Sequence, residues 1–269
     1  ADNVEIVENL ASTLWFALER PDDALEWYEK LLELAESRLE ALEPLANLLQ
    51  ELERWQRLTE ILVEIAELTP DFLQQRQKYL ELGQIWSKQL DDDEKAVGYF
   101  NEVLNMDSSD EDAINALVEL YGRTESWSDL VEVLSLRAQL NPQGETETRL
   151  LRAQILSDRL DDVEGAAQEY EDILNYEPEN GLILEELKKL YTENEKWENL
   201  ADLLERNLNL LRDPDLQREN LESLAVLNQT VLNNSRLASD YYNRILDLEP
   251  DNVDIIQVLE DLYQSDGKH

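Results

Sequence analysis

Cysteine is absent from this chain, and histidine occurs only once, at the last position, His269. Without cysteine there is no disulfide, no thiolate metal ligand and no thiol nucleophile. Without an internal imidazole there is no catalytic triad, no general base near neutral pH and no zinc site built on histidine. The sequence therefore predicts a protein that is not an enzyme, and it assigns no catalytic, cofactor-binding or metal-binding residues.

Glycine and proline are also scarce, with 7 of each in 269 residues. The glycines stand apart from one another, so no glycine-rich loop is present to hold a phosphate. No run of 18 apolar residues and no secretory signal pattern occur. We expect a soluble protein that does not insert into a membrane, cytoplasmic by default, with the periplasm as the open alternative.

Positive charge is in short supply, because 23 basic residues face 62 acidic ones and the formal net charge is −39. This balance disfavours nucleic acids and anionic membranes, whose phosphates attract lysine and arginine. An acidic surface keeps a long chain soluble, and it also suits life at high salt. It favours a protein or peptide partner with basic patches, whose binding should weaken when salt rises to physiological strength.

Apolar residues recur every three or four positions, which is the period of an α-helix. One example runs through Trp127, Leu130, Val131, Leu134 and Ala138. No segment alternates as a strand does. We predict an all-α chain of about fifteen helices of roughly 14 to 19 residues, separated by breaks. The clearest breaks fall at 20–23, 69–71, 91–93, 108–110, 141–144, 161–162, 177–181, 213–215 and 249–252.

The helices form an internal repeat with a period of about 72 residues. One series pairs an alanine with an aromatic residue four positions on, at Ala24 and Tyr28, Ala96 and Phe100, Ala166 and Tyr170, and Ala238 and Tyr242. A small residue precedes each pair, at Ala11, Gly83, Ala153 and Ala225. A second series, out of phase with the first, consists of Trp55, Trp127 and Trp197. Each period thus holds two unlike half-units, and such periods are typical of solenoids.

The alanine and aromatic half-units resemble the tetratricopeptide repeat, a helix-turn-helix module. The resemblance is carried best by Ala166, Tyr170 and Pro178 and by Ala238, Tyr242 and Pro250. It implies a right-handed superhelical α-solenoid with the first helix of each pair on the concave face, and a protein-binding role. The tryptophan half-units depart from the motif at the start of their second helix.

We predict a single solenoid of seven helix pairs over residues 1–269, followed by one terminal helix. The expected units are 1–37, 38–70, 71–108, 109–142, 143–179, 180–214 and 215–250, with the terminal helix at 251–264. Tyr121 and Tyr191 each precede a tryptophan by six residues, whereas six residues after Tyr263 comes His269. We therefore expect the chain to be a piece of a longer array, belonging to a larger complex.

Acidic clusters occupy the turns between helices. Asp91 with Glu94, and Asp161 with Glu164, have the spacing of capping boxes at helix starts. The alternating ligands and the glycine of a calcium loop are missing. We interpret these clusters as helix caps.

Four cations and one tryptophan are the candidate partner-binding residues. Arg76, Lys78, Arg149 and Arg152 lie on first helices that are nearly neutral, and basic groups on adjacent first helices form the carboxylate clamp of some tetratricopeptide proteins. Trp27 stands outside the repeated positions and is a candidate surface contact.

Three hypotheses of function follow: a non-enzymatic scaffold or adaptor that binds a protein or peptide, a structural spacer of a very large repeat protein, and an acidic chaperone of basic proteins. Replacing Arg149 and Arg152 by alanine separates the first two in a pull-down. Binding through the first helices predicts the loss of partners, and a spacer predicts no change.

Overall fold

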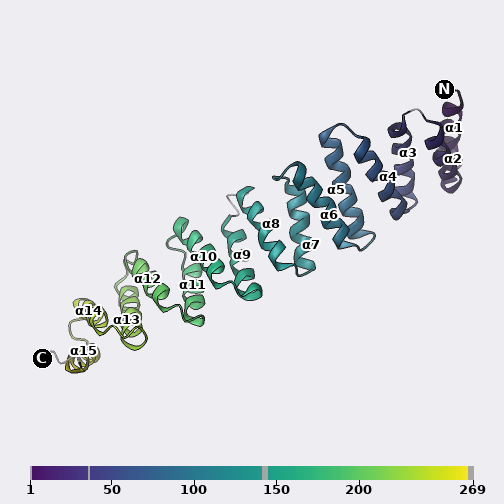
Figure 1. Ribbon diagram of the computed structural model, residues 1–269. Coiled ribbons are helices and arrows are strands. Elements are labelled where there is room, and N and C mark those ends of the chain that lie inside the picture. The colour runs from purple at the N-terminus through teal and green to yellow at the C-terminus, as the bar shows by residue number, and fades with distance from the viewer. Residues whose placement is uncertain (1, 36, 141–144, 266–269) are drawn as a thin grey trace. The chain divides into compact units, whose positions relative to one another are not determined.

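Figure 1 shows the computed structural model, which describes residues 2–35, 37–140 and 145–265. The chain divides into two compact units, an N-terminal unit of residues 1–142 and a C-terminal unit of residues 143–269. The predicted break at 141–144 and the final residue His269 lie outside the described residues.

Every regular element in the described ranges is helical, which confirms the predicted all-α fold with its fifteen α-helices. The N-terminal unit contains α1 (Asp2–Ser12), the π-helix η1 (Thr13–Ala17), α2 (Pro21–Leu34), α3 (Arg38–Glu51), α4 (Trp55–Leu68), α5 (Phe72–Lys88), α6 (Asp93–Met106), α7 (Glu111–Arg123) and α8 (Trp127–Leu140). The C-terminal unit contains α9 (Glu145–Leu160), α10 (Val163–Tyr176), α11 (Gly181–Glu193), α12 (Trp197–Leu208), α13 (Pro214–Thr230), α14 (Ser235–Leu248) and α15 (Val253–Ser265). Several helices are shorter than predicted, down to 11 residues in α1.

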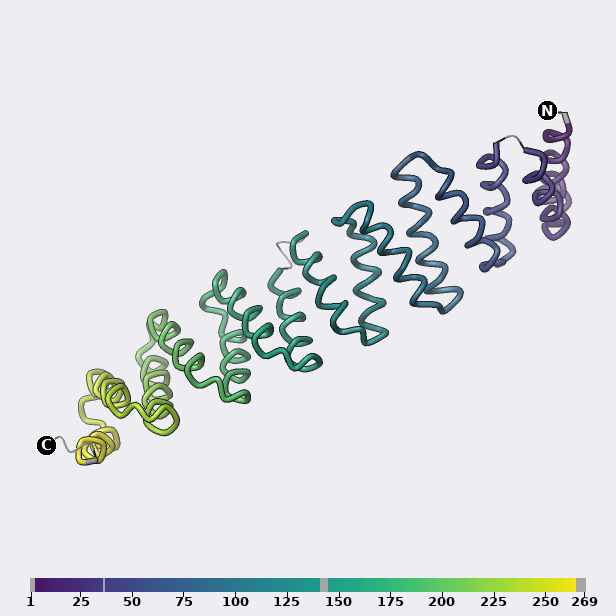
Figure 2. Tube along the Cα trace, in the orientation of Figure 1, coloured from purple at the N-terminus to yellow at the C-terminus, as the bar shows by residue number. Residues whose placement is uncertain are grey.

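Within each unit, every helix packs against its neighbours in sequence and reverses direction at each turn (Figure 2). The odd pairs are α1/α2, α5/α6, α9/α10 and α13/α14, and the even pairs are α3/α4, α7/α8 and α11/α12. Such a chain of local contacts defines an α-solenoid, in which each repeat is stabilised by the next. Both units have the helix-pair arrangement of tetratricopeptide-like proteins.

The odd pairs are held close by the small residues of the repeat. Ala11, Ala153 and Ala225 are fully buried, as are the alanines of the facing helices. At Gly83 even a methyl group would not fit, because its carbon would lie 2.7 Å from the ring of Phe100. A larger side chain here would force α5 and α6 apart.

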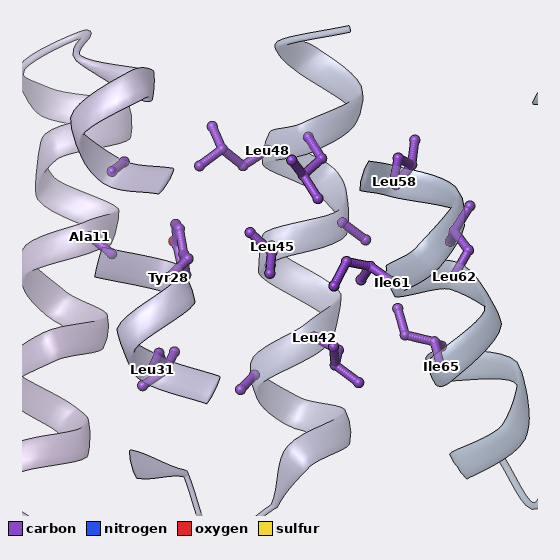
Figure 3. Packing of buried hydrophobic residues seen from close by; sticks show 14 of the residues in the cluster. Ala11, Tyr28, Leu31, Leu42, Leu45, Leu48, Leu58, Ile61, Leu62 and Ile65 are labelled. Carbon is purple, nitrogen blue, oxygen red and sulfur yellow. The ribbon is translucent and has the colours of Figure 1, made fainter. Parts of the chain in front are cut away.

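The even pairs bury larger aliphatic side chains instead. Figure 3 shows Leu42 of α3 on the side that faces Ile61 and Ile65 of α4, while Leu45 and Leu48 lie on the side that faces α2; all of them are almost fully buried. Each such side chain contributes roughly 1.5–3 kcal/mol on burial. The tryptophans of the second series begin α4, α8 and α12, as predicted, and those of α4 and α12 pack half-buried against the cores.

The turns inside the helix pairs differ between the two kinds of pair. In even pairs the amide after the turn donates to a carbonyl five positions back, as from Ser126 to Tyr121 at 2.9 Å. In odd pairs the equivalent bond reaches six positions back, as from Asp92 to Trp86 at 2.9 Å. The alternation seen in the side chains is therefore present in the backbone too.

All seven of these turns pass through a left-handed residue that is not glycine. They are Glu19, Glu53, Asp91, Glu125, Asp161, Glu195 and Asn233, with φ between 51° and 55°. This conformation costs a residue with a side chain about 1–2 kcal/mol, and glycine is its usual occupant.

The left-handed turns correct the predicted capping boxes. Asp91 and Asp161 are the left-handed residues themselves, and the helix caps are the next residues along. Asp92 accepts a hydrogen bond from the amide of Lys95 at 3.1 Å, and Asp162 accepts one from Gly165 at 2.9 Å. The predicted caps were one residue too early, because aspartate occurs both at the left-handed position and at the cap that follows it.

Replacing Glu125 by glycine should raise the free energy of unfolding by about 1 kcal/mol, because glycine adopts the left-handed conformation without strain. Glu119→Gly in the middle of α7 is the matched control and should lower it by about 1 kcal/mol. Urea unfolding followed by circular dichroism measures both. Equal destabilisation by the two changes would show that the turn stores no strain.

Candidate partner-binding cleft

The predicted cations of the N-terminal unit are both paired with carboxylates of the chain. Arg76 on α5 is bonded to Asp110, the cap of α7, and its Nη2 lies 2.7 Å from Asp112. The two carboxylates raise the pKa of Arg76 further above its usual range. The ammonium of Lys78 lies 3.7 Å from Glu43 on α3 and from Glu81 on its own helix. The contacts of Arg76 and Lys78 reach the first helices of the neighbouring pairs.

Arg149 and Arg152 in the C-terminal unit come together around one buried carboxylate. Arg149 lies 3.0 Å from both Glu169 and Asp172 on α10, and Arg152 lies 2.8 Å from Glu169. Burial alone would lower the pKa of Arg149, but the carboxylates around it raise that pKa overall. This cluster joins α9 to α10. Whether its arginines also contact a partner stays a prediction.

Trp27 on α2 is half-buried against the core of the N-terminal unit. The ammonium of Lys30 lies 4.2 Å from the centre of its ring, a cation–π contact. The exposed part of the ring is thus partly covered by its own helix. A surface contact through Trp27 stays a prediction as well.

One interaction recurs at the repeat period and was missed in the sequence. The position of Arg76 is occupied by Thr146 and Arg218 in the next two odd pairs. Thr146 donates to Glu177 at 2.6 Å, and Arg218 lies 3.4 Å from Glu249. Each contact ties the first helix of an odd pair to the segment leading into the next first helix. The spacing of 70 residues from Arg76 to Thr146 and of 72 residues from Thr146 to Arg218 was the sequence signal that could have revealed this contact.

A cleft of about 730 Å³ lies between the first helices α11 and α13 of the C-terminal unit. Both helices present residues spaced three and four apart to it, which places them on one helical face. They are Gly181, Leu184, Glu185 and Lys188 on α11, and Leu216, Glu219, Asn220 and Ser223 on α13. The end of α12 and the segment 210–213 close one side. The volume is in the range of known ligand sites.

Asn220 is the unusual residue of this cleft. It is only 6% exposed, yet neither Nδ2 nor Oδ1 has a hydrogen-bond partner among the described residues. A buried amide without partners costs about 1–3 kcal/mol. By the repeat register Asn220 takes the position of Lys78 and Thr148, and the sequence alone gave no reason to single it out.

Leucine side chains supply the apolar part of the cleft wall. Leu184 and Leu211 are half-buried, and Leu210 and Leu216 are 44% and 49% exposed. A second hollow shares Pro178, Glu179 and Leu210 with the cleft and extends it over the start of α11. The cleft thus combines apolar surface with one buried polar group.

Neither a metal site nor a membrane span is found in the described residues. They hold no group of three or more acidic side chains or histidines able to bind a metal ion. None of their helices is both long enough and apolar enough to cross a bilayer.

No protein-family model matches this chain, and no curated protein matches it. Solved structures share its fold. It matches 39% of the length of a chain in the structure of Naa15/Naa10 bound to HypK-THB, over 97% of its own, with 13% identity and a TM-score of 0.50. A tetratricopeptide repeat protein from Parabacteroides merdae matches at 11% identity, over 97% of this chain and 99% of that one, with a TM-score of 0.41.

The TPR2AB domain in the pHSP90 complex of yeast Sti1 matches at 14% identity, over 98% of both chains, with a TM-score of 0.36. At such identities the likeness concerns the fold alone. The chain has a divergent tetratricopeptide-like fold.

Arg76→Ala should lower the free energy of unfolding by about 2 kcal/mol, because it leaves the carboxylate of Asp110 buried without its cation. Lys78→Ala on the same helix should cost less than about 1 kcal/mol, since its ion pairs are long and partly exposed. Denaturant unfolding of the two variants measures the difference. Equal decreases in the free energy of unfolding for the two variants would show that the ion pair of Arg76 with Asp110 has no special structural role.

Proposed function

We propose that the protein is a non-enzymatic scaffold that binds a segment of a partner protein in the cleft between α11 and α13. The unpartnered amide of Asn220 is the observation that supports this function most directly. A peptide bond offers one donor and one acceptor, which is what the side-chain amide of asparagine needs. A segment that bonded to this amide would remove the cost of burying it without partners.

The fold is compatible with this class of function, because helical repeats present long surfaces to partners. A structural spacer would give Asn220 no purpose. An acidic chaperone of basic proteins would use the general surface charge of −39, and its binding would not depend on a single amide. The two alternatives therefore differ from the scaffold in what Asn220 does.

Asn220→Leu should have two opposite effects. It should raise the free energy of unfolding by about 1–2 kcal/mol, because an apolar side chain of similar size removes an unsatisfied polar group. It should weaken the binding of peptides selected from a displayed random library by about tenfold, because the bonds to the backbone are lost. Thermal unfolding and fluorescence polarisation measure the two effects on the full chain.

Asn228→Leu is the matched control on the same helix. Asn228 is also buried, but its Nδ2 donates to the carbonyl of Leu224 at 2.9 Å, and it does not line the cleft. Its replacement should not stabilise the chain and should leave peptide binding unchanged. Peptide binding that is insensitive to Asn220→Leu would contradict the scaffold function at this cleft.

A further inference from the structure

The charges around the cleft give a basis for naming the chemistry of its occupant, and this step rests on the proposed function. Four carboxylates line the cleft, and two cations accompany them. The carboxylates belong to Glu179, Glu185, Asp213 and Glu219, and the cations to Lys188 and Arg212. The wall is therefore acidic overall.

Ion pairs within the chain neutralise these carboxylates unequally. Lys188 lies 2.8 Å from Glu185, so these two charges largely cancel. Glu219 lies 3.8 Å from Arg218, which also lies 3.1 Å from Glu222. For Glu179 no cation is within ion-pair distance among the described residues. Asp213 accepts a hydrogen bond from the amide of Asp215 as the cap of α13, so the exposed carboxylates of Glu179 and Glu219 are the ones available to meet a basic partner.

The length of the cleft limits the segment that it can hold. The lining faces of α11 and α13 each extend over eight residues, from Gly181 to Lys188 and from Leu216 to Ser223. This corresponds to about 10 Å along a helix, or about three residues of extended chain. One side chain can therefore sit among the leucines while its neighbours lie near the acidic rim.

We infer that the cleft recognises an extended segment of a partner protein that carries one apolar side chain with lysine or arginine beside it. The apolar side chain packs between Leu184, Leu211 and Leu216. Asn220 turns its buried amide toward the segment and bonds to its backbone, donating from Nδ2 to a carbonyl and accepting an N–H at Oδ1. Glu179 and Glu219 attract the basic side chains, so binding weakens as salt rises.

Synthetic peptides of about eight residues, enough to extend beyond the cleft on both sides, test this inference. The probe peptide has a central leucine between arginines. Three companions replace the arginines by serine, the arginines by glutamate, or the leucine by serine. Fluorescence polarisation with the full chain should give the order arginine, serine, glutamate in falling affinity. The peptide without leucine should bind at least about tenfold more weakly than the probe.

Two double variants locate the charge effect. Glu179→Gln with Glu219→Gln should weaken the probe peptide by about fivefold at low salt and reduce the salt dependence. Glu186→Gln with Glu198→Gln changes the net charge equally on α11 and α12, at exposed residues outside the cleft, and should have little effect. Equal effects of the two double variants would overturn the inference, since general surface charge would then explain the binding.

The remaining outcomes separate the inference from the function on which it rests. If the serine peptide binds as tightly as the arginine peptide and Asn220→Leu weakens both, the scaffold function stands and the basic specificity is wrong. If no peptide binds in a way that depends on Asn220, both are wrong. Concentration-dependent dimerisation abolished by Asn220→Leu in sedimentation experiments would make the occupant a second copy and would also overturn the inference.

Discussion

The close approach of two helices in each odd pair is the constraint on which the solenoid depends. It requires a side chain no larger than a methyl group at four positions, and none larger than hydrogen at Gly83, where the ring of Phe100 takes the space. The aromatic residue then fills the volume that the small residue leaves. The even pairs bury leucine and isoleucine between their helices instead, so two kinds of packing alternate along the chain. The two kinds of turn follow this alternation.

Much of the fold could be predicted because its signals are periodic. Helical type, the number of helices and the alternation of half-units are all repeated along the sequence, so errors at one position are corrected at the others. The tryptophans marked the starts of α4, α8 and α12 for the same reason. The capping residues could not be separated from the left-handed residues, because aspartate suits both environments and they are adjacent. Only backbone geometry distinguishes Asp91 from Asp92.

The candidate site could not be predicted, for a physical reason. Sequence reasoning selected cations on first helices, since charge can be read directly from the residue type. Asn220 is significant because its buried amide has no hydrogen-bond partner among the described residues, and a missing partner leaves no periodic pattern in the sequence. Ion pairs between side chains of neighbouring repeats likewise cannot be read from the sequence of a single repeat. The sequence suggested that Arg76 could bind a partner, whereas in the structure it is paired with Asp110 at the start of the next first helix.

The cleft at Asn220 also has a consequence for the stability of the C-terminal unit. The cleft lies between the first helices α11 and α13, so an occupant that contacts both links neighbouring helix pairs. Anything that fills the cleft stabilises the folded state in proportion to its occupancy. In a solenoid, where each repeat is held only by the next, that gain is passed along the stack. The rigidity of the C-terminal unit would then depend on whether the cleft is occupied.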